Sequence, residues 1–137
     1  MKIMIIGIGT DLVDIRRIER SLGRFGDAFC NRLFTETERR YCDTGAGRKR
    51  ASAYAMRFAA KEACSKALGT GFGQGVFWRD IENSHQESGK PVLTLTGGAL
   101  DRLNALKPEG FKVQADVSLT DEYPYAMAVV IISAEHE

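Results

Sequence analysis

Apolar and polar residues follow one another along this chain in patterns that separate strands from helices. Residues 3–9 form an apolar run broken by glycines, which is typical of a buried strand. The end of this strand is expected to bring Thr10 and Asp11 to a junction between strand and helix. From there apolar residues recur at three- and four-residue steps as far as Phe25, and arginines occupy the opposite face. This spacing predicts an amphipathic helix, and Gly23 and Gly26 suggest that it ends nearby.

The middle of the chain is predicted to be helical. A short helix is expected over residues 27–34, and the segment 35–38 (TETE) has the form of a capping box that begins another helix, ending near residue 42. After a polar loop, residues 51–68 contain seven alanines and neither glycine nor proline, which predicts the longest helix. Its small side chains form one stripe, so its packing partner is expected to approach closely. The stripe consists of Met56, Ala59, Ala60, Ala63 and Ala67.

Strands and turns dominate the last third of the chain. Apolar or alternating segments predict four strands, over residues 76–83, 91–95, 112–119 and 125–133. One further helix is expected over residues 97–106. The order of strand, several helices, two strands, helix and two strands favours a single α+β domain over residues 1–137, with a largely antiparallel sheet packed around the long helix.

Composition and charge agree with one compact domain. The 137 residues are 44% hydrophobic and 27% charged, which argues against a disordered chain. The net charge is only +1, but residues 11–57 carry 11 basic and 7 acidic side chains. This asymmetry predicts a cationic surface in the N-terminal part of the chain, one that favours an acidic partner.

The cysteines and the apolar segments indicate in which cellular compartment the protein is expected. Cys30, Cys42 and Cys64 are too scattered for a disulfide framework and form no CxxC motif, so we expect small buried side chains in a reducing environment. No apolar run approaches the roughly 18 residues needed to cross a bilayer, and the apolar start lacks the cleavage site of a signal peptide. A soluble, cytoplasmic protein without membrane insertion is therefore expected.

Two carboxylates are the most informative candidates for chemistry. Asp11 follows the first strand, and Glu62 lies within the alanine-rich helix, where an unpaired carboxylate would be costly. Two neighbouring carboxylates suit Mg²⁺, which completes its ligand shell with water and phosphate. The alternative is structural: Asp11 would cap the following helix and Glu62 would pair with Lys66. The residues alone leave both interpretations open.

Cationic and hydroxyl side chains surround Glu62 along the same helix. Lys66 lies one turn later with Ser65 beside it, and Arg57 and Lys61 form a second pair at the same spacing. Cations beside a metal-binding carboxylate would suit a polyphosphate ester. A solvated, salt-bridged helix face is the alternative.

A row of arginines, Arg17, Arg20 and Arg24, lines one side of the first predicted helix. Such a row is either a solvated face or a binding surface for an acidic helix or a nucleic-acid backbone. Few aromatic residues are interleaved with these arginines, which argues against nucleic acid as the partner.

Two other features are interpreted as structural. His85 and His136 lie in a turn and at the C-terminus, so they offer neither a histidine metal site nor a Ser-His-Asp triad. The glycine-rich segment 69–75 follows a helix, whereas phosphate-binding glycine motifs follow a strand and open a helix. A structural loop is the favoured interpretation of this segment, with phosphate contact as the alternative.

Several segments, in the same order along nearly the whole chain, resemble one enzyme family. They are GIGTDLVDIRRIE (7–19), RFAAKEACSKALGTG (57–71), DIEN (80–83), GKP (89–91) and VSLTDEYPYAMAVVII (117–132). The chain thereby resembles the holo-[acyl-carrier-protein] synthases, the short, single-domain type of 4′-phosphopantetheinyl transferase. The KEAxxKAxGTG pattern of the long helix is highly specific in combination with the aspartate-containing opening.

The resemblance implies a reaction and an assembly. The reaction is Mg²⁺-dependent transfer of 4′-phosphopantetheine from coenzyme A to a serine of an apo acyl carrier protein, with release of adenosine 3′,5′-bisphosphate. The assembly is a homotrimer with coenzyme A in clefts between subunits. The family's metal ligands correspond to Asp11 and Glu62, and its phosphate-facing lysine corresponds to Lys66. Glu62 would take the serine proton, directly or through a metal-bound water.

Further residues correspond to binding segments of the family. Arg17 and Arg24 match positions that hold the acyl carrier protein, and Arg20 is added from its helical spacing. The segments expected to bind coenzyme A contain Arg57, Lys61, Ser65, Gly69, Thr70, Gly71, Lys90 and Pro91. Asp121 stands where many members carry a histidine, so the contact of that histidine with the coenzyme is not carried over.

Two other classes of function fit the same residues. A non-catalytic module would use the arginine row to bind an acidic protein or a nucleic acid. A metal-dependent hydrolase would use the carboxylates to direct water at a phosphate ester. Mass added to an apo carrier protein, only in the presence of coenzyme A and Mg²⁺, would distinguish the transferase from both.

Overall fold

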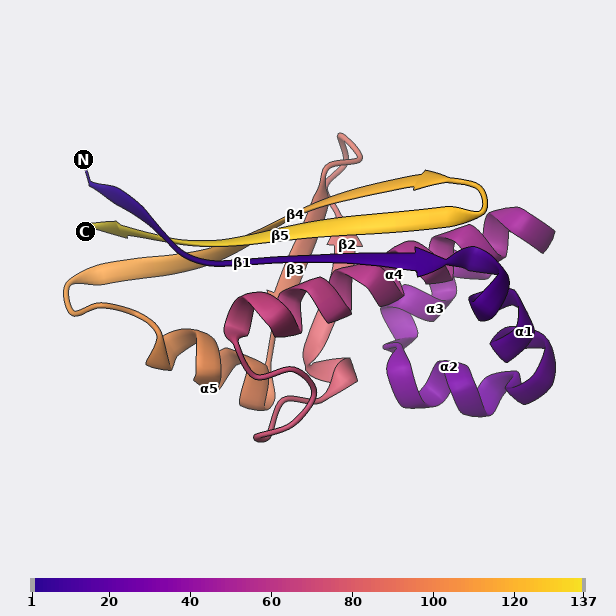
Figure 1. Ribbon diagram of the computed structural model, residues 1–137, viewed down its shortest axis with the longest axis horizontal. Coiled ribbons are helices and arrows are strands. Elements are labelled where there is room, and N and C mark those ends of the chain that lie inside the picture. Colours follow the sequence, from indigo (N-terminus) through magenta and orange to yellow (C-terminus); the bar gives the residue numbers. More distant parts are fainter. Residues whose placement is uncertain (1, 137) are drawn as a thin grey trace.

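Three long antiparallel strands form the larger of two sheets in the computed structural model, which describes residues 2–136 (Figure 1). The strand order is β1-β5-β4, so the first and last strands of the chain are hydrogen-bonded neighbours. A second, two-stranded antiparallel sheet consists of β2 and β3. The strands are β1 (Ile3–Asp14), β2 (Ile81–His85), β3 (Pro91–Leu95), β4 (Phe111–Glu122) and β5 (Tyr125–His136). The predicted α+β fold with a largely antiparallel sheet is confirmed.

The helices fill the connections between these strands. They are α1 (Ile15–Phe25), α2 (Asp27–Leu33), α3 (Glu36–Cys42), α4 (Gly47–Leu68) and α5 (Gly97–Ala105), with a 3₁₀ turn η1 (Trp78–Asp80) before β2. The predicted capping box at the start of α3 is present, because the Thr35 and Glu38 side chains each accept a hydrogen bond from the other residue's backbone N–H. The longest helix is α4, as expected, and it begins four residues before its predicted start.

The end of the first strand differs from its prediction. Pairing between β1 and β5 continues as far as Asp14, opposite Tyr125, so Asp11 lies inside the strand and not at its junction with α1. Asp14 provides the N-cap instead, since its side chain accepts from the backbone N–H of Arg16 at 3.0 Å. Alternate residues along β1 point to the same side, and this places Asp11 on the side that faces α4.

The predicted strand over residues 76–83 is wrong in its first half. Residues 78–80 form the turn η1, in which the Trp78 ring stacks on Phe72 at a centroid distance of 3.7 Å and on Phe58 at 5.0 Å. These three aromatic side chains come from α4, from the loop after it and from η1. Packing between elements therefore overrides the strand propensity of the local sequence.

The alanine stripe of α4 lies against the larger sheet, as predicted. Ala59, Ala60 and Ala63 are fully buried. A Cβ atom added to Gly9 would lie 1.9 Å from the carbonyl oxygen of Ala63, and one added to Gly7 would lie 2.3 Å from that of Ala67. Helix and strand backbones thus touch, because glycine and alanine leave no side chains to separate them.

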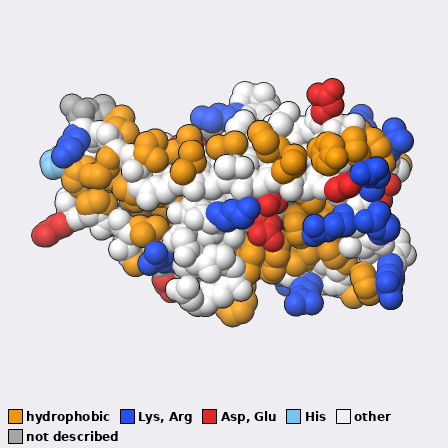
Figure 2. Space-filling model, viewed as in Figure 1, with side chains coloured by type: hydrophobic (Ala, Val, Ile, Leu, Met, Phe, Trp, Pro, Cys, Tyr) orange, Lys and Arg blue, Asp and Glu red, His pale blue; other side chains and the backbone are white. Residues whose placement is uncertain are grey.

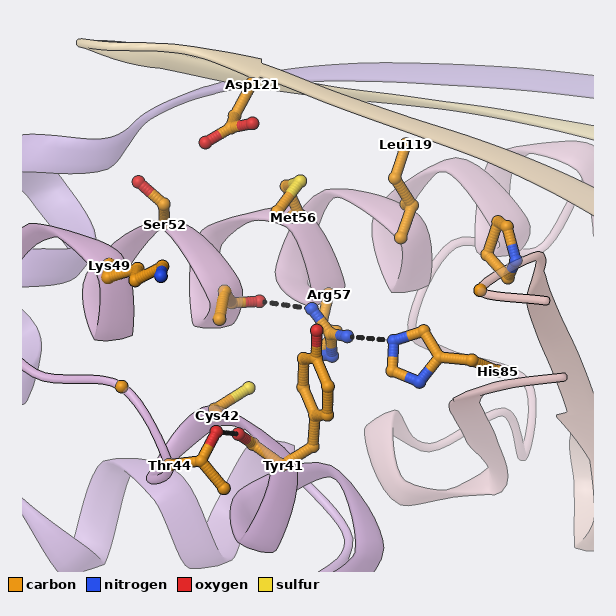
Figure 3. A pocket seen from close by; sticks show the side chains of 14 residues that line it. Tyr41, Cys42, Thr44, Lys49, Ser52, Met56, Arg57, His85, Leu119 and Asp121 are labelled. Atoms are coloured by element: carbon orange, nitrogen blue, oxygen red, sulfur yellow. Dashed lines mark hydrogen bonds between the residues drawn. The ribbon is translucent and has the colours of Figure 1, made fainter. Parts of the chain in front are cut away.

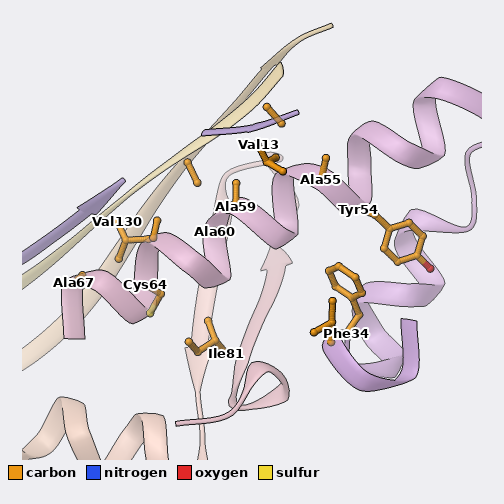
Figure 4. Packing of buried hydrophobic residues seen from close by; sticks show 14 of the residues in the cluster. Val13, Phe34, Tyr54, Ala55, Ala59, Ala60, Cys64, Ala67, Ile81 and Val130 are labelled. Carbon is orange, nitrogen blue, oxygen red and sulfur yellow. The ribbon is translucent and has the colours of Figure 1, made fainter. Parts of the chain in front are cut away.

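The hydrophobic core occupies both sides of α4 (Figure 4). Val13 and Val130 pack on it from the larger sheet, while Phe34 and Ile81 pack from the opposite side. The three cysteines are free and buried, as expected. Among residues 2–136, the helices lack the combination of length and apolar character that spanning a membrane requires.

Candidate active site

The contact between β1 and α4 brings Asp11, Glu62 and Lys66 together. Lys66 Nζ lies 3.2 Å from Asp11 Oδ1 and donates a hydrogen bond to the Thr10 carbonyl oxygen at 3.0 Å. Figure 2 shows basic and acidic side chains next to one another where α4 runs beneath β1. Since Gly7 and Gly9 allow the backbones to touch, the strand position that follows them places its carboxylate beside the helix.

Glu62 is close enough to Asp11 for the two carboxylates to repel each other. Burial, followed by the charge of Asp11, raises the pKa of Glu62, and the nearby cations Lys66 and Arg17 oppose that rise. Among residues 2–136, no Lys, Arg or His side chain lies within 4.0 Å of the Glu62 carboxylate. The two contacts of the structural interpretation are not the ones that form, because Lys66 pairs with Asp11 and Asp14 caps α1.

This donor set fits a hard divalent cation. Two carboxylates that destabilise each other are both stabilised by a cation between them, and Mg²⁺ commonly uses one or two protein carboxylates. Within residues 2–136 no group of three or more His, Cys, Asp or Glu side chains is positioned to hold a metal ion. A cation bound at Asp11 and Glu62 would thus keep ligand positions for water and phosphate oxygens.

The arginine row of α1 lies along one exposed groove. Arg17, Arg20 and Arg24 line a surface hollow of about 430 Å³ together with Ser21 and Phe25. The Phe25 side chain is 55% exposed, so the groove combines charge with an apolar surface. Figure 2 shows Lys and Arg side chains gathered over α1. This combination suits an acidic amphipathic helix.

Arg17 connects the groove to the carboxylates. Its guanidinium carbon lies 5.9 Å from the centre of the Phe58 ring, and its charge acts on Glu62. A partner helix lying along the arginine row would therefore have one end near Asp11 and Glu62.

A pocket of about 570 Å³ lies on another flank of α4, between α3, the β2-β3 turn and β4 (Figure 3). Of the residues expected to bind coenzyme A, Arg57 and Pro91 line this pocket, whereas Lys90 lies in the same turn and is exposed. Asp121, at the end of β4, also lines it.

Sequence reasoning missed most of the pocket. Tyr41, Lys49 and His85 are lining residues that were given no role. One signal was available, because Lys49, Ser52, Met56 and Arg57 recur at helical spacing and so share a face of α4. No sequence pattern indicated that α3 and β2 would meet this face, since the whole of α4 lies between these two elements in the sequence.

Lys61 and Ser65 correct the expectation that their helix face binds coenzyme A. Lys61 is fully buried, its Nζ lies 2.7 Å from Glu38 Oε1, and it also donates to the backbone carbonyls of Trp78 and Ile81. All three protons of the ammonium group are therefore used inside the protein. Ser65 is 1% exposed and donates to the Glu62 carbonyl oxygen at 2.7 Å. Both side chains are structural, and their positions on α4 do not belong to the solvated, salt-bridged face considered as the alternative.

The segment from Gly69 to Gly71 ends α4. Gly69 adopts a left-handed conformation with φ of +80°, and its N–H donates to the Lys66 carbonyl oxygen. The N–H groups of Thr70 and Gly71 both donate to the Ser65 carbonyl oxygen. The loop therefore has a structural role as a C-cap, and a coenzyme contact by these three residues stays a prediction.

Comparison with known proteins identifies several relatives. The model of the 4′-phosphopantetheinyl transferase superfamily matches residues 7–128. The holo-[acyl-carrier-protein] synthase of Methylorubrum populi is 59% identical over 131 residues, which cover 96% of this chain and 95% of that protein. A crystal structure of the Bacillus anthracis holo-(acyl-carrier-protein) synthase in complex with CoA (3′,5′-ADP) is 35% identical with a TM-score of 0.76, covering 96% of this chain and 99% of that one. The Helicobacter pylori enzyme in complex with coenzyme A is 31% identical, also with a TM-score of 0.76, over 91% and 98% of the two chains.

Proposed function

Since the chain belongs to the 4′-phosphopantetheinyl transferase superfamily, we propose that it transfers 4′-phosphopantetheine from coenzyme A to a serine of an apo acyl carrier protein in a Mg²⁺-dependent reaction. The serine oxygen forms a bond to the β-phosphorus of coenzyme A, and the bond from that phosphorus to the bridging oxygen breaks. Adenosine 3′,5′-bisphosphate leaves as the second product. The observation that carries this proposal is that the carboxylates of Asp11 and Glu62 lie close to each other and to the ammonium group of Lys66.

Each residue of the carboxylate site has a separate task in this reaction. Asp11 and Glu62 would hold Mg²⁺, which neutralises the charge that develops on the transferring phosphoryl group. Lys66 is half exposed, with its ammonium group held at Asp11, and from there it would contact the diphosphate of the coenzyme. A carboxylate that holds a cation is a weaker base than a free one, so Glu62 would receive the serine proton directly or through a metal-bound water.

The arginine row would hold the protein substrate. Acyl carrier proteins are acidic and helical, and Arg17, Arg20 and Arg24 offer a cationic groove with the exposed Phe25 side chain within it. Arg17 acts on Glu62 as well as lining this groove, so a helix bound there would have one end near the carboxylates. The acceptor serine is expected at that end.

The arrangement around α4 supports a coenzyme site shared between subunits. Arg57 and Glu62 are five positions apart, about 140° around a helix of 3.6 residues per turn, so the pocket and the carboxylates face different flanks. A single coenzyme molecule that contacts both the pocket and the carboxylates would therefore lie between two copies of the chain. One copy would contribute the pocket and the other the carboxylates. This arrangement is compatible with the homotrimer that the family resemblance implies, and we propose that assembly for this chain.

An apolar sheet face offers the surface for that assembly. Several large hydrophobic residues on the side of the larger sheet that faces away from α4 are 38–63% exposed, and a row of them follows β1 in Figure 2. They include Ile3, Ile5, Ile8, Leu12, Tyr125 and Met127.

We also infer a cytoplasmic location. Cys42 and Cys64 are free, and burial raises the pKa of each thiol to about 12, so both stay protonated and unreactive. Cys30 is free and buried too. Three free thiols in a chain of this length are typical of a reducing compartment.

Intact-protein mass spectrometry of an apo acyl carrier protein tests the function. The carrier protein is expected to gain one phosphopantetheinyl group only when the enzyme, coenzyme A and Mg²⁺ are all present. Asp11→Ala and Glu62→Ala should each abolish this gain with the circular dichroism spectrum retained, while the exposed control Asp101→Ala should keep it. Normal turnover by Glu62→Ala would overturn the site assignment. Free 4′-phosphopantetheine released without carrier protein would favour the hydrolase, and binding of carrier protein without a mass gain would favour the non-catalytic module.

A further inference from the structure

The pocket beside α4 contains a hydrogen bond whose donor follows from chemistry alone. Arg57 and His85 meet with 2.8 Å between the guanidinium Nη2 and the imidazole Nε2 (Figure 3). A guanidinium group only donates, so Nε2 of His85 must accept. His85 therefore carries its proton on Nδ1 and is neutral in this arrangement.

The Arg57 side chain is held on three sides and has no acidic partner. Its Nη1 donates to the Ala53 carbonyl oxygen at 3.0 Å, and its guanidinium carbon lies 4.3 Å from the centre of the Tyr41 ring. The residue is only 3% exposed, its Nε has no hydrogen-bond partner, and within residues 2–136 no carboxylate lies within 4.0 Å of it. A buried guanidinium without a carboxylate is stabilised by an anionic ligand.

We propose that His85 is a positioning residue for coenzyme A: its neutral ring holds the Arg57 guanidinium at the pocket for a phosphate group of the coenzyme, and protonation of His85 releases it. This inference rests on the proposed binding of coenzyme A by Arg57. The Tyr41 ring lies against both partners, with its centre 4.3 Å from that of His85 and 4.3 Å from the Arg57 guanidinium carbon, so it keeps the donor and the acceptor next to each other.

The groups around His85 determine how it responds to pH. Tyr41 on α3 and Arg57 on α4 contact it, and Cys42 on α3, Lys49 on α4 and Asp121 on β4 line the same pocket farther away. Burial, followed by the charge of Arg57, lowers the pKa of His85 below its ordinary value near 6.5. The ring is exposed and so exchanges protons with solvent. The affinity for coenzyme A should thus be highest at neutral pH, where His85 is neutral, and should fall as the pH decreases below neutral.

Calorimetric titration with coenzyme A at about pH 8 and about pH 5.5 tests the proposal. The secondary phosphate of coenzyme A titrates in the same range, so the wild-type curve alone is not diagnostic. His85→Gln places an amide oxygen near the position of Nε2 and does not titrate. We expect its Kd for coenzyme A to match that of the wild type at the higher pH. Between the higher and the lower pH, the Kd of the wild type should increase by a factor at least about three times larger than that of the variant. His136→Gln, the control at the other histidine, should keep the wild-type pH dependence.

A second set of variants tests whether His85 acts through Arg57. His85→Leu removes the acceptor and should raise Kd about tenfold at the higher pH, the effect of one hydrogen bond to a charged group. Arg57→Ala should raise Kd as well, and adding His85→Leu to Arg57→Ala should change it no further.

Three outcomes would overturn the positioning role. The first is that the Kd of His85→Gln changes with pH as much as that of the wild type, and the second is that the effects of His85→Leu and Arg57→Ala on Kd are additive in the double variant. The third is that, at the lower pH, the wild type binds coenzyme A more tightly than His85→Gln does. Failure of the wild type to bind coenzyme A or to modify the carrier protein would instead contradict the proposed function. The two failures are therefore distinguishable.

Discussion

Lys61 and Lys66 lie on the same helix, five residues apart, and occupy opposite environments. Lys66 is half exposed beside Asp11, whereas Lys61 is fully buried against Glu38. Burial lowers the pKa of Lys61, and the charge of Glu38 opposes that shift. Glu38 also accepts two hydrogen bonds from Asn83, at 2.8 and 2.9 Å, so this pair joins α3, α4 and β2.

Removing one partner of the buried pair should be costly. Lys61→Met leaves the Glu38 carboxylate buried without a cation, and we expect a loss of about 3 to 5 kcal/mol in the free energy of unfolding. The double variant Lys61→Met/Glu38→Gln should recover part of that loss, which urea denaturation of the four proteins measures. Additive losses would contradict the pairing. Folded Lys61→Met should keep the wild-type Kd for coenzyme A, because its side chain does not reach the surface.

The arginines of α1 should affect the protein substrate and not the chemical step. Arg24→Glu reverses a charge at the end of the row away from Glu62, so we expect KM for the acyl carrier protein to rise about tenfold with kcat nearly unchanged. Arg40→Glu, at an exposed arginine of α3, is the control and should leave KM unchanged. Equal effects of the two variants on KM would indicate a general charge effect without a docking surface.

At the scale of elements, the contact of β1 with α4 sets the position of the carboxylates. Gly7 and Gly9 face the helix and are followed at the same two-residue period by Asp11. On the helix, Ala63 supplies the carbonyl oxygen that lies against Gly9, and Glu62 is its neighbour in sequence. The separation of the two acids therefore depends on how closely two backbones approach.

A methyl group on Gly9 should disturb both stability and activity. The added Cβ would lie 1.9 Å from a backbone atom that cannot rotate away, so Gly9→Ala should lower the free energy of unfolding by about 2 to 3 kcal/mol. The turnover of the folded enzyme should fall as well, since Asp11 and Glu62 move apart. Within residues 2–136, no atom beyond the chain neighbours and the nearby helix backbone lies within 4 Å of a Cβ at Gly23, so Gly23→Ala should keep full activity and gain about 0.4 to 1 kcal/mol. Chemical denaturation and the mass assay measure both quantities.

At the scale of the whole molecule, the sheet separates two surfaces. The side facing α4 forms the core, and the opposite side carries large apolar residues such as Ile8 and Leu12, each 63% exposed. A β-bulge between Ile5 and Gly7 shifts the alternation of β1, so that Ile5 and Ile8 are both exposed although three positions separate them. The apolar surface thereby continues along the strand.

Placing a charge on this surface should dissociate the proposed trimer. Ile8→Arg is expected to change the molar mass measured by light scattering from that of three chains to that of one, because an unpaired charge would be buried at the interface. Leu100→Arg, at an exposed apolar residue of α5, should remain trimeric. A monomeric wild-type protein would contradict the assembly. Coenzyme A affinity should fall together with the trimer if the site is shared between subunits.

Much of the molecule was accessible from the sequence alone. Apolar periodicity predicted α1, the TETE motif predicted the capping box of α3, and the alanine-rich segment without glycine or proline predicted the long helix, because each of these signals is local in the sequence. The pairing of Asp11 with Glu62 was one of two open interpretations. The extension of β1 to Asp14 had a signal in the two-residue alternation of Gly7, Gly9, Asp11 and Val13.

Only the tertiary structure decided which charged groups lie inside. Lys61 and Lys66 look alike in sequence, and the difference comes from Glu38, which is 23 positions away from Lys61 and reaches it through the packing of α3 on α4. The contact of Arg57 with His85 likewise joins two elements that no sequence pattern connects. Local patterns determine the elements and their apolar faces, whereas burial and charge partners depend on distances across the fold, which are set by the packing of the entire chain.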